Sequence, residues 1–242
     1  MEGFIIELKV LTFNIRHGRG TDLRLSLERI SRVIKRVQPH IVGVNEIDKH
    51  FSRRSLYKDQ PKELEYLLGM KEFFAPAISI KRKGKLTREY GNAIFTSLPV
   101  AYFHSHLIQS DSKYKENRSV VEVGISLGER NISVFTTHFS LSRNMHQKQT
   151  EWLVKRMGQL NHPCIIMGDW NCRPSSTRLK PIQSRFQTVF HQTQPTFPSA
   201  YPKWQLDYIF FTDHFSVKDA AVLTSERKAS DHLPVYGEFL LR

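Results

Sequence analysis

The chain has 242 residues, of which 40% are hydrophobic and 11% aromatic, so it can bury a sizeable core and is not typical of a disordered sequence. Its apolar runs are only a few residues long, which excludes a transmembrane helix. A formal net charge of +13, from 36 Lys and Arg against 23 Asp and Glu, favours a polyanionic partner: nucleic acid, an anionic membrane surface or a phosphorylated substrate.

Domain organisation and redox state follow from features that the chain lacks. It has no internal repeat and no Gly/Ser-rich linker, so we expect residues 1–242 to form one domain. Its two cysteines cannot form a disulfide framework. Cys164 lies within an apolar run and is expected to be buried and reduced, which fits a cytoplasmic location.

The first part of the chain alternates strands with helices. A β-rich run over 6–15 precedes a helix whose apolar stripe covers 27–37. Ser26 is the expected N-cap of this helix, and Pro39 ends it. Further strands are expected over 41–44, 73–80 and 92–96, the last two forming a hairpin with a basic loop, and a short helix is expected over 62–68.

The second part of the chain continues this alternation. Two alternating strands separated by a turn at 128–131 predict a hairpin over 119–139, and a second long helix follows Asn144. Strands are also expected over 164–167, 206–211 and 235–241. Hairpins with interspersed helices predict two mixed β-sheets packed face to face, each covered by helices on its outer side.

Polar residues able to bind metal or phosphate lie where these apolar runs end or begin. In a mixed sheet the end of one strand lies beside the start of its neighbour, so all these residues can meet at one rim. Each one alone is an ordinary turn former, but their coincidence predicts a site. They are Asn14, Glu46, His138 and Asp169 with Asn171 at strand ends, and Asp207 and the pair Asp231-His232 at strand starts.

The carboxylates in this set indicate a metal. Buried carboxylates are costly unless they are paired or bind a cation. Oxygen ligands are those that Mg²⁺ takes, so a rim with Glu46, Asp169, Asp207 and Asp231 predicts a site for Mg²⁺, with Mn²⁺ as an alternative.

The same residues lie in motifs, in an order that resembles the endonuclease/exonuclease/phosphatase superfamily of deoxyribonuclease I-like metal-dependent phosphoesterases. The resemblance runs from about residue 8 to the C-terminus and implies a four-layer α-β-β-α sandwich. The family includes nucleases, inositol-polyphosphate phosphatases and neutral sphingomyelinases, and its members are often monomers. The motifs are Asn14 in TFNIR, Glu46 in VGVNEI, Gly91-Asn92-Ala93-Ile94, Thr137-His138, Gly168-Asp169-Trp170-Asn171, Leu206-Asp207-Tyr208-Ile209 and Ser230-Asp231-His232-Leu233-Pro234.

The resemblance also implies roles for these residues. Glu46 is similar to the principal metal ligand of the family, with Asn14 and Asp231 close to the metal. His232, oriented by Asp207, corresponds to the general base or to a phosphate contact. Asp169 would position or deprotonate the attacking water, and Asn171 and His138 would hold phosphate oxygens; the motif leaves open whether His232 or Asp169 takes the proton.

Two features lie beside these motifs. Asn45 stands where the family commonly has Gln before the metal-binding Glu, so a supporting hydrogen bond is expected to shift while metal binding is kept. A basic stretch precedes the Gly91-Asn92 motif, and it can be either an arm that holds a polyphosphate backbone or a solvated loop. The residues expected to bind substrate here are Asn92, Lys81, Arg82, Lys83 and Lys85.

These observations favour a Mg²⁺-dependent phosphodiesterase, with nucleic acid somewhat preferred over lipid as the substrate. The alternative within the same class is a phospholipid or small-molecule phosphoesterase. A non-catalytic binding module is less consistent with the sequence, because every predicted ligand and the predicted base are present.

Overall fold

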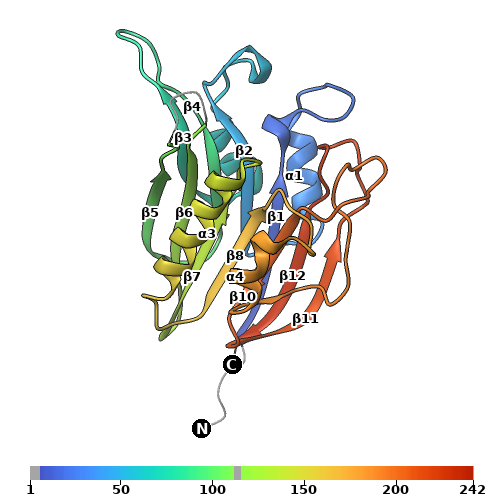
Figure 1. The fold of residues 1–242 in the computed structure, drawn as a ribbon. Coiled ribbons are helices and arrows are strands. Elements are labelled where there is room, and N and C mark those ends of the chain that lie inside the picture. Colours follow the sequence, from blue (N-terminus) through green and yellow to red (C-terminus); the bar gives the residue numbers. More distant parts are fainter. Residues whose placement is uncertain (1–5, 112–115, 242) are drawn as a thin grey trace.

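The computed structural model describes residues 6–111 and 116–241 and contains two six-stranded sheets packed face to face (Figure 1). The first sheet is formed by β1 (Ile6–Asn14), β2 (Ile41–Lys49), β3 (Lys71–Ile80), β4 (Arg88–Thr96), β11 (Phe215–Val222) and β12 (Val235–Leu241). Its order is β11-β12-β1-β2-β4-β3, with β1 and β2 parallel and the other neighbours antiparallel.

The second sheet is built in the same way. It is formed by β5 (Val100–Ile108), β6 (Arg118–Leu127), β7 (Arg130–Thr137), β8 (Cys164–Asp169), β9 (Gln187–Thr188) and β10 (Asp207–Phe211). Its order is β5-β6-β7-β8-β10-β9, and its one parallel pair within the described residues is β7 with β8. Both expected hairpins are confirmed, since β3 pairs with β4 and β6 with β7.

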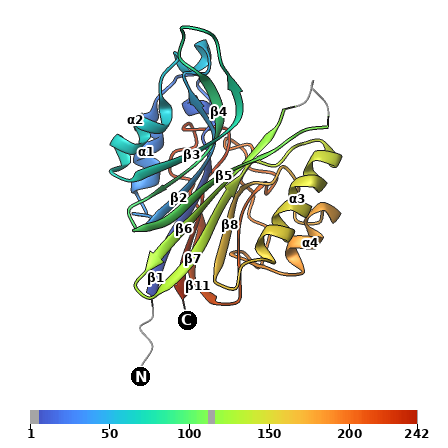
Figure 2. The same cartoon turned by 90° about the vertical axis from the view of Figure 1, so that its left-hand side faces the viewer.

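Helices cover the outer face of each sheet. In Figure 2, α1 (Leu27–Lys35) and α2 (Gln60–Leu68) lie on one side of the paired sheets, and α3 (Arg143–Met157) and α4 (Lys180–Gln183) lie on the other. The predicted four-layer α-β-β-α sandwich is therefore confirmed. None of the helices in the described part of the chain is long and apolar enough to cross a membrane.

Burial of apolar side chains holds the layers together. Val10 and Ile94 of the first sheet and Val123 of the second are fully buried in the cluster between the sheets. The apolar stripe of α1, including Ile30, packs on the outer face of the first sheet, and each such side chain contributes roughly 1.5–3 kcal/mol. The Oγ of Ser26 accepts a hydrogen bond from the backbone N–H of Arg29, as expected for its N-cap role.

The sequence missed three strands, β5, β9 and β11. Each is an edge strand and pairs with a single neighbour, so much of its surface remains exposed. Polar side chains such as His104 in β5 break the apolar pattern that marks a strand in the sequence. The tertiary pairing, and not local hydrophobicity, therefore decides that these segments are strands.

Gly168 allows β8 to lie against the end of β7. Its φ of 140° is one that residues with a side chain rarely adopt, and a Cβ at this position would lie 2.0 Å from the carbonyl oxygen of Thr137. The glycine precedes Asp169, so this close approach also determines where the Asp169 side chain points.

We expect Gly168→Ala to lower the free energy of unfolding by about 2–4 kcal/mol, because the new methyl group meets backbone that cannot move aside. Chemical denaturation followed by circular dichroism measures this change. Gly128→Ala is the matched control: its φ is also positive (67°) but a Cβ there has open space, so only the conformational cost of about 1 kcal/mol is expected. Equal losses in the two variants would contradict the close-approach argument.

Candidate active site

The polar residues at the strand ends come together in one cluster between the two sheets. β1 ends at Asn14 and β8 ends at Asp169. β10 starts at Asp207, which pairs directly with Asp169 in the antiparallel register. The sheets thus bring residues that are far apart in the sequence into one cluster.

The side chain of Asn14 connects the sheets within this cluster. Its Nδ2 donates to Glu46 Oε1 at 3.1 Å and to Asp169 Oδ2 at 3.0 Å. Asn14 and Glu46 belong to the first sheet and Asp169 to the second, so one amide group holds two carboxylates across the interface between the sheets. Its Oδ1 accepts from the backbone N–H of Arg16 at 3.1 Å.

Glu46 is placed by an irregularity in β2. The strand was expected over 41–44, but it continues to Lys49 with a bulge between Val44 and Ile47, and Glu46 has a φ of 58°. Bulges and positive φ values are common beside functional sites. Burial raises the pKa of Glu46, and the nearby charges of Asp169 and Asp231 act in the same direction, although the hydrogen bond from Asn14 opposes them.

His232 and Asp207 form a hydrogen-bonded pair. His232 Nδ1 lies 2.9 Å from Asp207 Oδ2, which also accepts from Thr196 Oγ1 at 2.6 Å. The other ring nitrogen, Nε2, faces Asp169 Oδ2 at 3.7 Å. Burial disfavours the charged imidazole, but the carboxylates of Asp207, Asp169 and Asp231 outweigh it and raise the pKa of His232 to about 10.

His138 lies beside the same carboxylates but differs in charge. Burial lowers its pKa to about 4, so the imidazole is neutral near pH 7. Asn171 Nδ2 lies 2.8 Å from His138 Nε2 and donates to the backbone oxygen of Phe139 at 2.9 Å. Asn171 therefore orients His138 here, and the phosphate contact predicted for Asn171 requires one of these bonds to be exchanged.

Asp231 lies at the more open side of the cluster. Its Oδ2 is 3.4 Å from Nε of Arg16, and both side chains are about one-third exposed. Arg16 and His17 belong to a short 3₁₀ helix, Arg16–Gly18, that directly follows the end of β1. His17 Nδ1 lies 3.6 Å from Glu46 Oε2, and burial together with the cation of Arg54 lowers the pKa of His17 to about 4.

The donor atoms of this cluster fit a hard divalent cation. The charges of Asp169 and Asp231 add to burial in raising the pKa of Glu46, and a bound cation would offset this repulsion. Ligand atoms of Asp169, Asp207 and His232 all lie within 4.8 Å of one another, and Asp207 Oδ1 is buried without a hydrogen-bond partner. Nδ1 of His232 is already hydrogen-bonded to Asp207, so it is not free to bind a metal. The Glu46 side of the cluster, where the ligand atoms are oxygens, therefore suits a hard ion better than the His232 side.

A buried amide network supports the cluster from beneath. Asn45 Oδ1 accepts from the backbone N–H of Asp169 at 2.9 Å, and its Nδ2 donates to Asn92 Oδ1 at 2.9 Å. Asn92 Nδ2 in turn donates to Ser119, at 3.0 Å from both its carbonyl and its hydroxyl oxygen. Asn92 was expected to bind substrate; its side chain is buried, and its hydrogen bonds run to Asn45 and Ser119. Asn45 thus forms two side-chain hydrogen bonds within this network.

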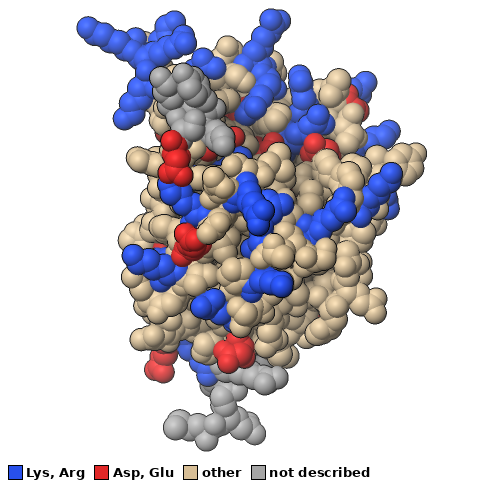
Figure 3. Space-filling view, in the orientation of Figure 1, with Lys and Arg blue, Asp and Glu red and all other residues tan. Residues whose placement is uncertain are grey.

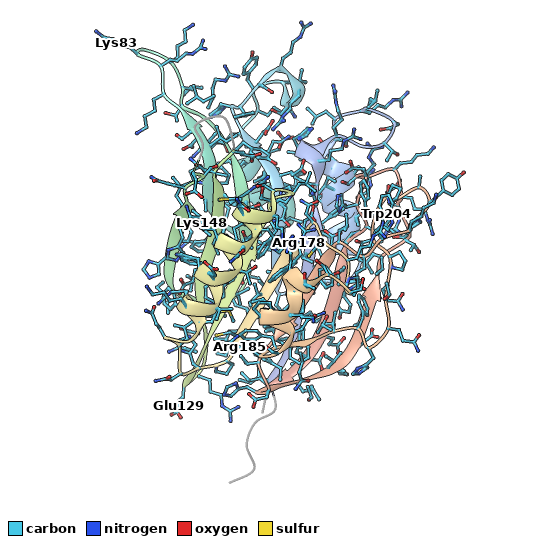
Figure 4. The ribbon with its side chains drawn as sticks, in the orientation of Figure 1. Lys83, Glu129, Lys148, Arg178, Arg185 and Trp204 are labelled. Atoms are coloured by element: carbon cyan, nitrogen blue, oxygen red, sulfur yellow. The ribbon has the colours of Figure 1, made fainter. Side chains whose placement is uncertain are left out.

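The basic residues expected to bind substrate lie on the hairpin that joins β3 to β4. Figure 1 shows this hairpin projecting beyond the body of the molecule, and Figure 4 places Lys83 at its outer end. Lys and Arg side chains are also frequent across the upper end of the molecule in Figure 3. The hairpin cations therefore lie away from the cluster and can meet only a ligand that extends beyond it. They are Lys81, Arg82, Lys83 and Lys85, all exposed.

Three further residues that were not predicted from the sequence belong to this cluster. Arg16 contacts Asp231, His17 faces Glu46, and Thr196 donates to Asp207. Arg16 could have been found as the last residue of the TFNIR motif, and His17 from its place directly after it. Thr196 carries no sequence signal, because it reaches Asp207 from a loop eleven positions earlier.

Comparisons with known proteins are consistent with this geometry. A family model described as "Endonuclease/Exonuclease/phosphatase family" matches residues 11–232, and no curated protein matches the chain. An endonuclease/exonuclease/phosphatase from Beutenbergia cavernae superposes with a TM-score of 0.80 at 21% identity, covering 97% of this chain and 72% of that one.

Two further structures are similar over nearly their whole length. A mannosyl-6-phosphatase from Bacteroides thetaiotaomicron has a TM-score of 0.78 at 17% identity, covering 96% of this chain and 99% of that one. The human Nocturnin catalytic domain with bound sulfate has a TM-score of 0.70 at 19% identity, covering 98% and 94%. At these identities the likeness shows a shared fold alone.

We expect His232 to stay protonated well above neutral pH in metal-free protein. NMR of histidine-labelled protein in EDTA should give it a pKa near 10, and Asp207→Asn should lower that value. Because the folded-state pKa of His232 lies above the unfolded value of about 6.5, protonated His232 stabilises the folded protein fully below pH 6.5. This contribution to the free energy of unfolding is lost as the pH rises through 10, and the loss is on the order of several kcal/mol. A His232 signal that titrates near 6.5 would contradict this assignment.

Proposed function

The chain belongs to the endonuclease/exonuclease/phosphatase family, whose members are phosphoesterase hydrolases, and from this premise we propose that it is a Mg²⁺-dependent phosphodiesterase. The observation that carries the proposal is the convergence of Glu46 and Asp169 on the single amide of Asn14, beside the Asp207–His232 pair. Such a cluster combines oxygen ligands, a proton-accepting carboxylate and a cationic donor.

Glu46 would be the principal metal ligand, with Asn14 and Asp231 close to the ion. The family is generally dependent on divalent metals, and we propose Mg²⁺, with Mn²⁺ as an alternative. The bound ion would neutralise charge on the phosphate and stabilise the leaving oxygen. The repulsion among the carboxylates around Glu46 supports this placement.

Of the remaining residues, one would accept the proton of the attacking water and the others would stabilise negative charge on the phosphate. Asp169 would orient the attacking water and accept its proton through Oδ2, the oxygen that accepts from Asn14 and lies 3.7 Å from Nε2 of His232. His232, with its pKa raised by Asp207, would remain protonated and stabilise negative charge on the phosphate. The neutral His138, oriented by Asn171, would donate from Nδ1, a buried atom without a hydrogen-bond partner.

We propose nucleic acid as the substrate, in preference to a phospholipid or a small phosphate ester. The exposed cations of the β3–β4 hairpin lie away from the cluster, so a ligand must be long to reach both. A polyanionic chain meets that requirement, and it also matches the net charge of +13.

We further propose that residues 1–242 act as one domain, as a monomer in the cytoplasm. The cluster takes residues from both sheets, so neither sheet can form it alone. Both cysteines are buried as free thiols, which is consistent with a reducing compartment.

His232→Ala and Asp207→Asn should each lower the turnover of bis-p-nitrophenyl phosphate by about 10²–10⁴-fold, because the phosphate loses its cationic donor. EDTA should abolish activity, and Mg²⁺ or Mn²⁺ should restore it. His214→Ala and Asp213→Asn change a similar but exposed pair and should leave turnover unchanged. Turnover near that of the wild type in either site variant, with an unchanged melting temperature, would refute the assignment.

Replacing Lys81, Arg82, Lys83 and Lys85 together by Gln should lower kcat/KM on plasmid DNA or RNA about tenfold or more at low salt. The same variant should cleave the small diester as the wild type does, because the hairpin does not reach the cluster. The dependence of kcat/KM on salt should also become weaker. Unchanged cleavage of DNA, abasic DNA and RNA, alongside activity on sphingomyelin vesicles, would favour the lipid alternative.

A further inference from the structure

Two buried imidazole nitrogens face the carboxylate of Glu46, one at each oxygen. His17 Nδ1 lies 3.6 Å from Oε2, and His138 Nδ1 lies 4.0 Å from Oε1. Within residues 6–111 and 116–241, neither nitrogen has a hydrogen-bond partner. Because buried polar atoms are rarely left unpaired in folded proteins, two of them beside one carboxylate indicate a functional arrangement.

The backbone at His17 is held in a strained conformation. Arg16 and His17 both have a φ of 47°, in the left-handed region that residues with a side chain seldom occupy. Glu46 on β2 is strained in the same way, with a φ of 58° at the bulge. Such conformations cost free energy and persist only where surrounding contacts fix them, so both segments need such contacts.

The side chain of Gln60 connects these two strained segments. Gln60 is the first residue of α2 and is fully buried. Its Nε2 donates to the backbone oxygen of His17 at 2.7 Å, and its Oε1 accepts from the backbone N–H of Asp48 at 2.9 Å. Asp48 follows Glu46 by two positions on β2. One amide group therefore fixes the His17 segment relative to the strand that carries Glu46.

Gln149 makes the same kind of connection from the other side of the molecule. It is fully buried in α3, which lies across the paired sheets from α2 (Figure 2). Its Nε2 donates to the backbone oxygen of His138 at 3.1 Å, and its Oε1 accepts from the backbone N–H of Ser140 at 2.9 Å. The backbone that carries the second histidine is thus also fixed by one buried amide.

Packing alone does not explain two fully buried glutamines. A buried amide costs free energy unless its hydrogen bonds are made, and a leucine of similar size would fill the same space without that cost. Both amides donate to the carbonyl group of a histidine. What the two glutamines share is therefore the placement of the two imidazoles that face Glu46.

We propose that Gln60 and Gln149 are positioning residues for Glu46. Each fixes the backbone of one histidine, and the two imidazoles hold the Glu46 carboxylate between them. The inference rests on the proposed function, which makes Glu46 the principal metal ligand, because residues that orient a ligand strengthen metal binding. Through these two glutamines, both outer helical layers contribute to the site.

Binding of Mn²⁺, followed by the electron paramagnetic resonance signal of the free ion, tests this role. Gln60→Leu and Gln149→Leu should each weaken binding about 10- to 100-fold, as expected when the support of a metal ligand is lost. Thr150→Val is the matched control: it removes a buried hydroxyl directly beside Gln149 whose hydrogen bond runs to His146, and it should leave the affinity unchanged. Wild-type affinity in both glutamine variants would overturn the proposal.

A double variant separates positioning from general destabilisation. His17→Ala should weaken Mn²⁺ binding by about the same factor as Gln60→Leu, because the glutamine acts through the histidine. Gln60→Leu introduced into His17→Ala should then add little, which is the signature of coupled residues. Losses that multiply would mean that Gln60 acts independently of His17, and would contradict the proposal.

NMR of histidine-labelled protein in EDTA gives a readout that needs no metal. Gln60→Leu should move the imidazole signals of His17 and leave those of His138 in place, and Gln149→Leu should do the reverse. If a leucine variant fails to fold, Gln60→Glu or Gln149→Glu keeps the shape and the accepting oxygen while losing the N–H donor, and the same signals should move. Signals of both histidines that stay in place would overturn the positioning role.

These measurements separate the inference from the proposed function. Wild-type protein that binds Mn²⁺ through Glu46, with both glutamine variants binding equally well, keeps the proposed function and loses the positioning residues. Mn²⁺ that binds Glu46→Gln as tightly as the wild type refutes the proposed function, and the imidazole signals alone then decide whether the glutamines position the histidines.

Discussion

The two hydrogen bonds from Asn14 to Glu46 and Asp169 are the link on which the cluster of carboxylates and histidines depends. Further hydrogen bonds cross the sheets beneath this link, from Asp169 N–H to Asn45 and from Asn92 to Ser119, whereas the burial of apolar side chains is non-directional and sets only the spacing of the sheets. An amide whose two hydrogens are both used on carboxylates has little freedom to rotate. The two acids are thereby held at one place, although they come from different sheets and are 123 residues apart by number.

This arrangement holds like-charged carboxylates close to Glu46, and they repel it. Burial and neighbouring charge both raise the energy of the Glu46 carboxylate, and its backbone occupies a positive φ within a bulge. The amide network of Asn45 and Asn92 and the close approach at Gly168 hold Asp169 against this repulsion from the opposite side. A divalent cation would relieve the same repulsion, so the features that cost stability in the metal-free protein are those that favour metal binding.

Two histidines a few ångströms from the same carboxylate illustrate how partners set charge. His138 Nε2 lies 3.4 Å from Asp169 Oδ2 and is neutral, because Asn171 occupies that nitrogen and burial dominates. His232 Nε2 lies 3.7 Å from the same oxygen and is cationic, because Asp207 binds its other nitrogen. One site thus holds a neutral and a charged imidazole.

The sequence by itself determined the layers and the positions of the polar residues at the strand ends, because apolar periodicity and the polar residues that interrupt it are local properties of the chain. Only the tertiary structure decided that Asn92 is buried in the amide network, that the cations around Lys83 point away from the cluster, and that His138 and His232 carry different charges. The edge strands β5, β9 and β11 were likewise decided by pairing. These outcomes depend on distances between residues that are remote in the sequence. Burial and neighbouring charges set the pKa of each histidine, and pairing with a neighbouring strand makes an edge segment a strand.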